Sequence, residues 1–359
     1  LNSTSRVEFS ASSLKVMAYE EQPQLEQVPT TTTTTTISEL ELPKVLVLRP
    51  PSIFTVYGKQ FSEKFHFLKA WESPIPTHQF LTTHASSVQA MLCSGYTPVT
   101  SDDVLRHLPS LRLIVTTSAG LNHIDLCECR RRGITIAGAG TAFSEDCADM
   151  AVGLLLDVLR RITAADRYVR AGLWPIKGDY PLGSKLGSKR VGIVGLGSIG
   201  LEVAKRLEAF GCTISYNSRK KKPSVSFAFY PNVCELAANS DILVICCALT
   251  DQTHHMINKE VLSALGEQGV IVNIARGAII DENELVHYLV QGKIAGAGLD
   301  VFENEPEVPE ELAALNNVVL SPHRAVYTEE SFQDLYELLL GNLEAFFSNK
   351  PLLSPIVDE

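Results

Sequence analysis

The segment Gly195-Leu196-Gly197-Ser198-Ile199-Gly200 has the spacing G-x-G-x-x-G and lies between two regular elements. An apolar run at 190–195 is typical of a buried strand, and a helical pattern begins at Leu201. In a pyrophosphate-binding turn, the first glycine permits the turn, the second lets phosphates approach the backbone, and the third lets the helix pack closely. We therefore predict a dinucleotide site, with a glycine-rich structural turn as the alternative. The residues expected to bind the dinucleotide here are Gly195, Gly197, Ser198, Ile199 and Gly200.

The end of the next expected strand, at 213–217, indicates which dinucleotide is bound. An NAD site usually carries a carboxylate there to hold the ribose 2′-hydroxyl. This chain instead continues with Ser218, Arg219 and Lys220. An arginine can hold a 2′-phosphate through two hydrogen bonds, and a serine hydroxyl can donate another. We expect NADP(H) as the cofactor, with NAD(H) used less well; the alternative is a solvated basic loop.

Size and charge exclude several classes of partner. The chain has 359 residues, of which 45% are hydrophobic, enough for two domains with sizeable cores. It carries 41 acidic and 31 basic residues, a net charge of −10. We therefore expect no nucleic acid and no membrane as partner, and no apolar run reaches the length of a membrane span. No bound metal is expected either.

The eight cysteines lack paired C-x-x-C spacing and are expected to be isolated reduced thiols. A redox-active pair at Cys127 and Cys129 is the alternative. Reduced thiols favour the cytoplasm as the location. The low-complexity segment at residues 1–43, rich in serine and threonine, is expected to be disordered. If that segment is a transit peptide, the location is a plastid instead.

Apolar segments alternate with helical patterns along the rest of the chain, which predicts parallel sheets with helical crossovers. We expect a long helix over 144–161 that is capped at Ser144, a C-terminal helix over 328–348, and helical structure at 101–108. The expected strands are 44–48, 113–117, 190–195, 213–217, 242–248, 269–275, 295–301 and 317–321.

The predicted fold class is α/β, with two Rossmann-like domains built on doubly wound parallel sheets. Residues 44–145 and 325–359 are expected to form a substrate-binding domain, because the last helix returns to the first domain. Residues 146–324 are expected to form the NADP-binding domain, which is thus inserted within the other domain. The cleft between the two domains is the expected site of chemistry.

Three side chains suited to reducing a 2-oxo acid follow expected strands of the second domain: Arg276, Glu305 and His323. Ligands of open parallel sheets bind beyond the carboxyl ends of the strands, so these side chains can meet in one crevice. Arginine can hold a carboxylate and polarise a carbonyl group, histidine can supply a proton, and a neighbouring carboxylate favours the imidazolium. Alone, each residue type is more often structural: a surface ion pair for the arginine, a turn for Glu305-Pro306 and a structural role for the histidine.

The chain also resembles the D-isomer-specific 2-hydroxyacid dehydrogenase family from about residue 44 to 355. Within that family it is similar to the plant NADPH-dependent glyoxylate/hydroxypyruvate and hydroxyphenylpyruvate reductases. The segments that carry the resemblance are Ala139-Gly140-Thr141-Ala142-Phe143-Ser144-Glu145, Tyr216-Asn217-Ser218-Arg219 and Ser321-Pro322-His323-Arg324-Ala325.

The resemblance implies a role for each of several residues. Arg276 is the substrate anchor, His323 the general acid and base, and Glu305 the partner of the histidine. Asp300 holds the carboxamide of the nicotinamide. The backbone loop Ser118, Ala119 and Gly120 receives the substrate carboxylate, and Cys247, Ala248 and Leu249 line the adenosine side. It also implies a homodimer formed through the cofactor domain and the arm around Leu173-Trp174-Pro175.

The expected activity is reduction of short 2-oxo acids, glyoxylate or hydroxypyruvate, to D-2-hydroxy acids with NADPH. One alternative is a reductase of hydroxyphenylpyruvate or another aromatic 2-oxo acid, which would use the same three catalytic side chains. An alternative of another class is a nicotinamide-sensing binding protein without turnover. A different oxidoreductase, acting on phosphorylated substrates, would need additional basic residues in the cleft.

Overall fold

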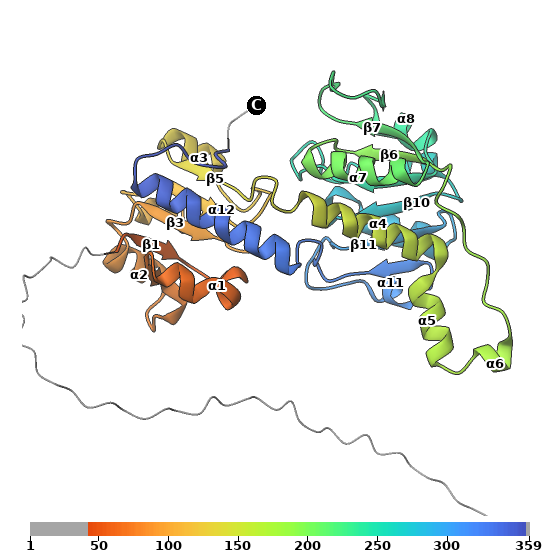
Figure 1. Cartoon of the computed structure of the whole chain (residues 1–359), viewed down its shortest axis with the longest axis horizontal. Coiled ribbons are helices and arrows are strands. Elements are labelled where there is room, and N and C mark those ends of the chain that lie inside the picture. Colours follow the sequence, from red (N-terminus) through yellow and green to blue (C-terminus); the bar gives the residue numbers. More distant parts are fainter. Residues whose placement is uncertain (1–41, 357–359) are drawn as a thin grey trace, which may run out of the picture. The chain divides into compact units, whose positions relative to one another are not determined.

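Two parallel sheets organise the protein, whose computed structural model describes residues 42–356 (Figure 1). We call the first sheet with its helices lobe 1 and the second sheet with its helices lobe 2. The predicted disordered segment 1–43 lies, except for its last two residues, outside the described residues. No helix in the described part of the chain is long and apolar enough to cross a membrane.

Lobe 1 contains a sheet in the order β2-β1-β3-β4-β5, with parallel neighbours throughout. Successive strand residues point to opposite faces, so Val45 and Val47 share a core with Phe61, whereas Leu46 shares a core with Leu81. The first face is covered by α1 and α12 and the second by α2 and α3. The elements are β1 (Lys44–Val47), α1 (Ile53–Ser62), β2 (His66–Lys69), α2 (Thr77–His84), β3 (Ala90–Cys93), β4 (Leu113–Thr116), α3 (Leu126–Arg131), β5 (Thr135–Ala137) and α12 (Glu329–Phe347).

Lobe 2 contains a sheet in the order β12-β11-β10-β9-β6-β7-β8, again parallel throughout. Helices α4 and α7 cover one face, and α8, α9 and α10 cover the other. The strands are β6 (Arg190–Val194), β7 (Thr213–Asn217), β8 (Ala228–Phe229), β9 (Ile242–Ile245), β10 (Val270–Asn273), β11 (Gly296–Leu299) and β12 (Val318–Leu320). The helices are α4 (Ser144–Arg160), α5 (Ile162–Arg170), α6 (Trp174–Lys177), α7 (Ser198–Ala209), α8 (Val233–Ala238), α9 (Lys259–Leu265), α10 (Glu282–Val290) and α11 (Glu310–Ala314).

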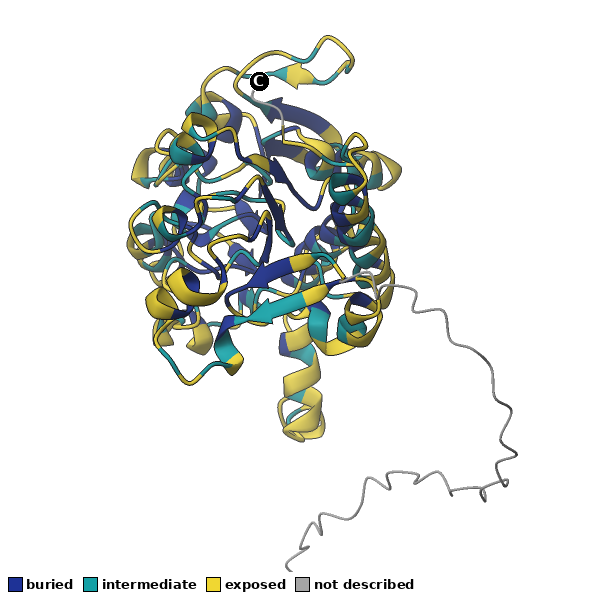
Figure 2. Ribbon diagram, turned by 90° about the vertical axis from the view of Figure 1, so that its left-hand side faces the viewer, coloured by how far each residue is buried: buried dark blue, intermediate teal, exposed yellow. Residues whose placement is uncertain are grey.

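The chain passes from lobe 1 to lobe 2 through α4 and returns through α12, so lobe 2 is inserted in the chain of lobe 1 (Figure 1). One continuous hydrophobic core includes residues of both lobes, for example Leu339 of α12 and Val191 of β6. Buried residues follow the strands of both sheets, and exposed residues cover the outer sides of the helices (Figure 2). The predicted α/β class with two doubly wound parallel sheets is confirmed.

Several local predictions need correction. Residues 101–108 form turns and one 3₁₀ turn at Leu105–His107 instead of a helix; that turn ends before Leu108, where the following Pro109 disfavours helical geometry. Ser144 is the first residue of α4 and not its cap; the N-cap is Phe143, without a capping side chain. Strands β2, β3, β5 and β8 were not predicted. β2, β5 and β8 each begin with an exposed residue and contain no apolar run of four, and β3 is a single apolar run of four between polar residues.

The strand orders determine where a ligand can bind. In the second sheet the order reverses between β6 and β9, and in the first between β1 and β3. At such a reversal the connections after adjacent strands leave on opposite faces and open a crevice. The glycine turn follows β6 and Cys246 follows β9, so the second crevice lies where the sequence predicts the dinucleotide.

Candidate active site

A cleft of about 810 Å³ is lined by residues of both lobes. Lobe 1 contributes the connections after β1, β3 and β4, and lobe 2 contributes those after β6, β9, β10, β11 and β12. The sequence-predicted residues that line this cleft are Ser118, Ala119, Gly120, Ile199, Cys247, Ala248, Leu249, Arg276, Asp300, Glu305 and His323. The glycines of the turn, Ser198 and residues 218–220 do not belong to this lining and lie at the adjoining ends of β6 and β7.

The glycine turn has the space that a dinucleotide needs. A Cβ on Gly195, whose φ is +96°, would fall 2.5 Å from the backbone nitrogen of Cys247, and one on Gly200 would fall 2.2 Å from the carbonyl oxygen of Gly195. These two glycines are therefore required by the protein's own packing. A Cβ on Gly197 would meet no atom of the described chain within 4 Å. The turn is thus open where phosphates would approach the start of α7, which fits a bound pyrophosphate.

The end of β7 lies beside this turn. Asn217 pairs with Val194 in the sheet register, and its carbonyl oxygen accepts a hydrogen bond from the N–H of Gly195 (2.9 Å). The following loop folds back on itself, because Ser218 Oγ donates to the carbonyl oxygen of Lys220 (2.6 Å). The exposed Arg219 is therefore presented next to the turn, where the ribose of a dinucleotide is expected.

Arg276 lies against the loop that follows β4. A Cβ on Gly120 would come within 2.5 Å of Arg276 Nη2, so the guanidinium is in contact with this loop. Within residues 42–356, the N–H groups of Ala119 and Gly120 donate no hydrogen bond, and the Gly120 carbonyl oxygen accepts one from Ser118 Oγ (2.6 Å). Burial lowers the pKa of Arg276, although the charge of Glu305 opposes this shift. Loop and guanidinium together offer several donors to a carboxylate.

His323 and Glu305 form the second half of the site. Nδ1 of His323 lies 2.7 Å from Oε2 of Glu305, and both side chains are about three-quarters buried. Burial alone would raise the pKa of Glu305, but the hydrogen bond and charge of His323, the N–H of Phe302 and the charge of Arg276 hold this pKa below its ordinary value. Glu305 is therefore an ionised acceptor that stabilises an imidazolium.

Asp300 determines where His323 is held. This completely buried carboxylate accepts hydrogen bonds from Ser321 Oγ (2.5 Å) and from the N–H groups of Arg324 (2.8 Å) and Ala325 (2.9 Å). The N–H of His323 donates to the Asp300 carbonyl oxygen (2.7 Å), which supports a left-handed backbone at His323 (φ 53°). Contact between Asp300 and the nicotinamide stays a prediction; in the structure the carboxylate positions the histidine loop.

Sequence reasoning missed three polar residues around this site. The hydroxyl of Tyr96 lies 3.2 Å from His323 Nδ1. His123 contacts Thr116 Oγ1 (3.1 Å), and burial, with the charge of Arg276, lowers the pKa of His123 to about 4. Asn273 is fully buried and donates to the carbonyl oxygen of Arg276 (2.9 Å), which shapes the loop after β10. No sequence pattern marked these residues, because each contact depends on how distant segments meet.

A group of possible metal ligands includes one residue of the cleft lining, Glu303. His254, His255 and Glu303 each place one ligand atom within 4.8 Å of the other two, and two imidazoles with a carboxylate are a donor set that zinc accepts. His255 Nε2 and Glu303 Oε1 are already hydrogen bonded at 2.8 Å, and the two imidazole rings are stacked. The expectation that the protein binds no metal stays a prediction.

Comparison with known proteins identifies the family. Residues 152–325 match the model "D-isomer specific 2-hydroxyacid dehydrogenase, NAD binding domain". A glyoxylate/hydroxypyruvate reductase of Arabidopsis thaliana is 56% identical over 88% of this chain and 98% of the relative. The chain belongs to the D-isomer specific 2-hydroxyacid dehydrogenases. This dehydrogenase is an NAD(P)-dependent oxidoreductase, and the predictions of its family and class of enzyme are confirmed.

One further relative of the dehydrogenase has a different substrate in its name. A hydroxyphenylpyruvate reductase of Plectranthus scutellarioides is 47% identical over 87% of this chain and 98% of the relative. Among solved structures, an NADPH-dependent glyoxylate/hydroxypyruvate reductase of Sinorhizobium meliloti, in complex with NADP and malonate, matches with a TM-score of 0.80. That protein is 34% identical, and the match covers 88% of this chain and 97% of the other.

Proposed function

We propose that this dehydrogenase reduces short 2-oxo acids, glyoxylate and hydroxypyruvate, to D-2-hydroxy acids with NADPH. The observation that carries the proposal is the arrangement of one cleft, in which Arg276 faces the loop at Gly120 and His323 is paired with Glu305. The positive charge of Arg276 matches the carboxylate of a 2-oxo acid, and the proton donor His323 matches its 2-oxo group. The names of the Arabidopsis and Sinorhizobium relatives support the same substrates.

Each side chain has a proposed role that follows from its chemistry. Arg276 and the N–H groups of Ala119 and Gly120 bind the substrate carboxylate, and Arg276 also polarises the 2-oxo group. His323, charged through its pairing with Glu305, donates a proton to the developing alkoxide. The bound nicotinamide supplies the hydride. The lining of the cleft by two lobes supports exclusion of water from these polar groups.

NADPH is the proposed coenzyme because the end of β7 carries no carboxylate. Ser218 and Arg219 occupy the place where an acid would repel a 2′-phosphate, and the neighbouring turn at Gly197 leaves room for the pyrophosphate. We propose that Gly195, Gly197, Ser198, Ile199 and Gly200 contact the pyrophosphate. Cys247, Ala248 and Leu249 are proposed to line the adenosine side, with Lys220 near the 2′-phosphate and Asp300 near the nicotinamide.

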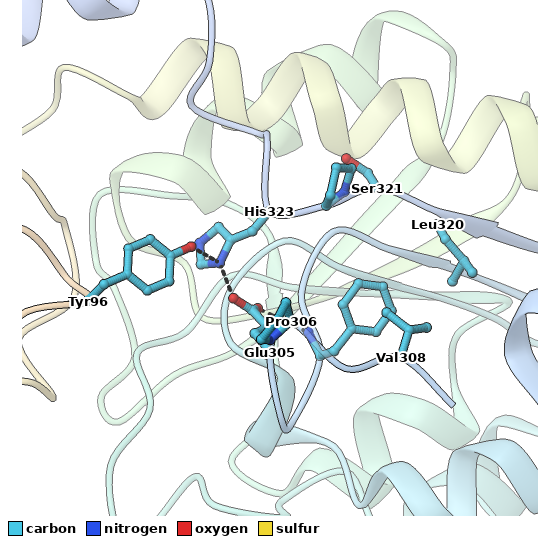
Figure 3. A pocket seen from close by; sticks show the side chains of 9 residues that line it. Tyr96, Glu305, Pro306, Val308, Leu320, Ser321 and His323 are labelled. Carbon is cyan, nitrogen blue, oxygen red and sulfur yellow. Dashed lines mark hydrogen bonds and ion pairs between the residues drawn. The ribbon is translucent and has the colours of Figure 1, made fainter. Parts of the chain in front are cut away.

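A second candidate substrate class is favoured by a neighbouring cavity. A mostly apolar pocket of about 420 Å³ adjoins the main cleft and shares Tyr96, Phe302, Glu305 and His323 with it (Figure 3). Pro306, Val308 and Leu320 give it the apolar walls that an aromatic side chain prefers. Reduction of hydroxyphenylpyruvate, the substrate in the name of the Plectranthus relative, is therefore the second candidate.

The test is an assay of NADPH and NADH oxidation with glyoxylate, hydroxypyruvate and hydroxyphenylpyruvate. We expect turnover of the two short acids with NADPH, and a loss of roughly 10²- to 10⁴-fold in His323→Ala. His66→Ala, at an exposed position of β2, is the matched control and should retain activity. Coenzyme binding without oxidation of NADPH by any acid would instead support the sensing protein, and hydroxyphenylpyruvate turned over alone would support the second candidate.

Domain bounds, assembly and location complete the proposal. We propose that residues 146–324 form the coenzyme domain and that residues 44–145 with 325–359 form the substrate domain. A homodimer is supported by the exposed apolar side chains of the segment around α6, where Trp174, Ile176 and Leu182 are 59%, 78% and 93% exposed. All eight cysteines lie in the described part of the chain and are free, which supports a reducing compartment. We propose the cytoplasm, with the plastid as the alternative.

A further inference from the structure

Tyr96 connects the two lobes at the catalytic histidine. It follows β3 in lobe 1, whereas His323 follows β12 in lobe 2. The Tyr96 hydroxyl lies 3.2 Å from Nδ1 of His323, and the two rings are 5.9 Å apart between centroids (Figure 3). Nδ1 thus has two oxygen neighbours, one from each lobe, because Oε2 of Glu305 lies 2.7 Å from the same nitrogen.

Each partner is anchored in its own lobe. The turn that carries Tyr96 is closed by the N–H of Thr97, which donates to the Ser94 carbonyl oxygen (2.9 Å), and by Arg49, whose guanidinium donates to the Tyr96 carbonyl oxygen (3.4 Å). The loop of His323 is held by the carboxylate of Asp300. The contact between the phenol and the imidazole joins these two anchored loops, so its geometry depends on how closely the lobes approach.

The position of the proton on the imidazole follows from Glu305. Since this carboxylate is ionised and can only accept, Nδ1 carries a hydrogen that it donates to Glu305 Oε2. The phenol oxygen of Tyr96 is therefore a second acceptor for the same N–H. Burial, followed by the negative charge of Glu305, raises the pKa of Tyr96, so the phenol keeps its own hydrogen and cannot act as a fixed anion.

We propose that Tyr96 is a positioning residue that orients the imidazolium of His323 and stabilises its charge when the two lobes are together. The inference rests on the proposed role of His323 as general acid. The other groups that face Tyr96 are Glu305, Tyr327, Arg276 and Asp300, all of which remain in place when the phenol oxygen is removed. Loss of one neutral acceptor should therefore destabilise the charged imidazole without abolishing it, because Glu305 still accepts from Nδ1.

Tyr96→Phe removes only the phenol oxygen, and Tyr57→Phe is the matched control. Tyr57 lies on α1, where its ring stacks on Tyr336 at 4.5 Å, away from the cleft lining. Reduction needs the protonated imidazole, so kcat/KM falls as the pH rises through its titration. We expect this alkaline fall to move to lower pH by about half to one unit in Tyr96→Phe, the size of one lost hydrogen bond of ordinary strength. The profile of Tyr57→Phe should superimpose on the wild type.

A second measurement does not require turnover. The ring resonances of His323, identified as those lost in His323→Gln, can be titrated by NMR in the protein with NADP⁺ added. We expect their midpoint to move down in Tyr96→Phe by the same amount as the kinetic profile. An unchanged midpoint, or a loss of rate that is equal at every pH, would overturn the inference. Failure of the proposed function is distinguished from this, because the wild type would then oxidise no NADPH with any 2-oxo acid, or His323→Ala would retain the activity of the wild type, whatever the titration shows.

Discussion

Gly120 lies so close to Arg276 that a Cβ at position 120 would come within 2.5 Å of Nη2 and 3.2 Å of Cζ of the guanidinium. Because these atoms form the far end of a flexible side chain, a methyl group there would displace Arg276 and leave the loop backbone in place. We expect Gly120→Ala to raise KM for glyoxylate by about ten- to a hundredfold, the equivalent of one or two weakened charge-assisted hydrogen bonds. Steady-state kinetics measures this change, and urea denaturation should show little loss of stability.

Gly153→Ala is the matched control for that substitution. Gly153 lies on an exposed position of α4, where a Cβ would meet no atom of the described residues within 4 Å. Its KM should equal that of the wild type, and alanine should favour the helix slightly. An unchanged KM in Gly120→Ala would mean that Arg276 does not bind the substrate from its position in the structure.

Arg219→Asp should reverse the coenzyme preference. The substitution places a carboxylate at the end of β7, where it repels a 2′-phosphate and can accept a hydrogen bond from a 2′-hydroxyl. We expect the ratio of kcat/KM for NADPH to that for NADH to fall by roughly 100-fold or more. Lys221→Asp, an exposed position in the same loop with the same change of charge, should have a much smaller effect. Equal use of both coenzymes by the wild type would contradict the assignment of NADPH.

The main elements of the site could be predicted from the sequence because they follow strand ends. Arg276, Glu305 and His323 come after β10, β11 and β12, which are neighbours in one parallel sheet. The carboxyl ends of parallel strands meet at one edge, so recognising the strands was enough to bring the side chains together. The glycine turn could also be predicted from the sequence, because its spacing reflects local packing at Gly195 and Gly200.

The rest of the site depends on contacts that leave no local pattern. Tyr96 lies in a short turn and contacts His323, which is 227 positions later in the sequence. The residues next to Tyr96 in the sequence therefore do not indicate that it contacts the catalytic histidine. The resemblance implies that Asp300 holds the nicotinamide, which stays a prediction; its hydrogen bonds to a segment more than twenty residues later in the chain could not be predicted. Such contacts require the placement of two loops in space, which strand and helix periodicity do not provide.

Asp300→Asn tests how far the histidine loop depends on this carboxylate. An amide has one oxygen and one nitrogen, so its N–H₂ group would face a donor among Ser321 Oγ and the N–H groups of Arg324 and Ala325. We expect kcat to fall by about ten- to a hundredfold and the free energy of unfolding to fall by about 1–3 kcal/mol, the cost of an unsatisfied buried donor. Asp251→Asn, at an exposed position, should change neither quantity.

The thiols should differ sharply in reactivity. Burial raises the pKa of Cys93 and of Cys147 to about 12, so their reactive thiolates are scarce near neutral pH. Cys127 is exposed and should be the first to react with a thiol reagent. Mass spectrometry after brief alkylation of the native protein should find the label at this position, and Cys127→Ser should lose the rapid phase. Rapid labelling of Cys147 would show that the cleft opens far more widely than in the structure.

His123 should make the protein less stable in acid. Burial, together with the charge of Arg276, lowers the pKa of His123 from 6.5 to about 4, so the unfolded chain binds this proton more tightly than the folded protein does. Stability is therefore complete above the unfolded value and declines as the pH falls from about 6.5 towards 4, by about 1–3 kcal/mol in total. Urea unfolding across this range measures the slope.

His123→Asn removes the titrating ring and should flatten that part of the profile, whereas His66→Asn, at an exposed position, should not. Asparagine keeps a polar group near Thr116 Oγ1, which limits the loss of stability at neutral pH. Since protonated His123 would also repel Arg276, acid should raise KM for the substrate in the wild type more than in the variant. Parallel acid profiles for the wild type and His123→Asn would show that the pKa of His123 is the same in the folded and unfolded protein, so that burial does not hold the ring neutral.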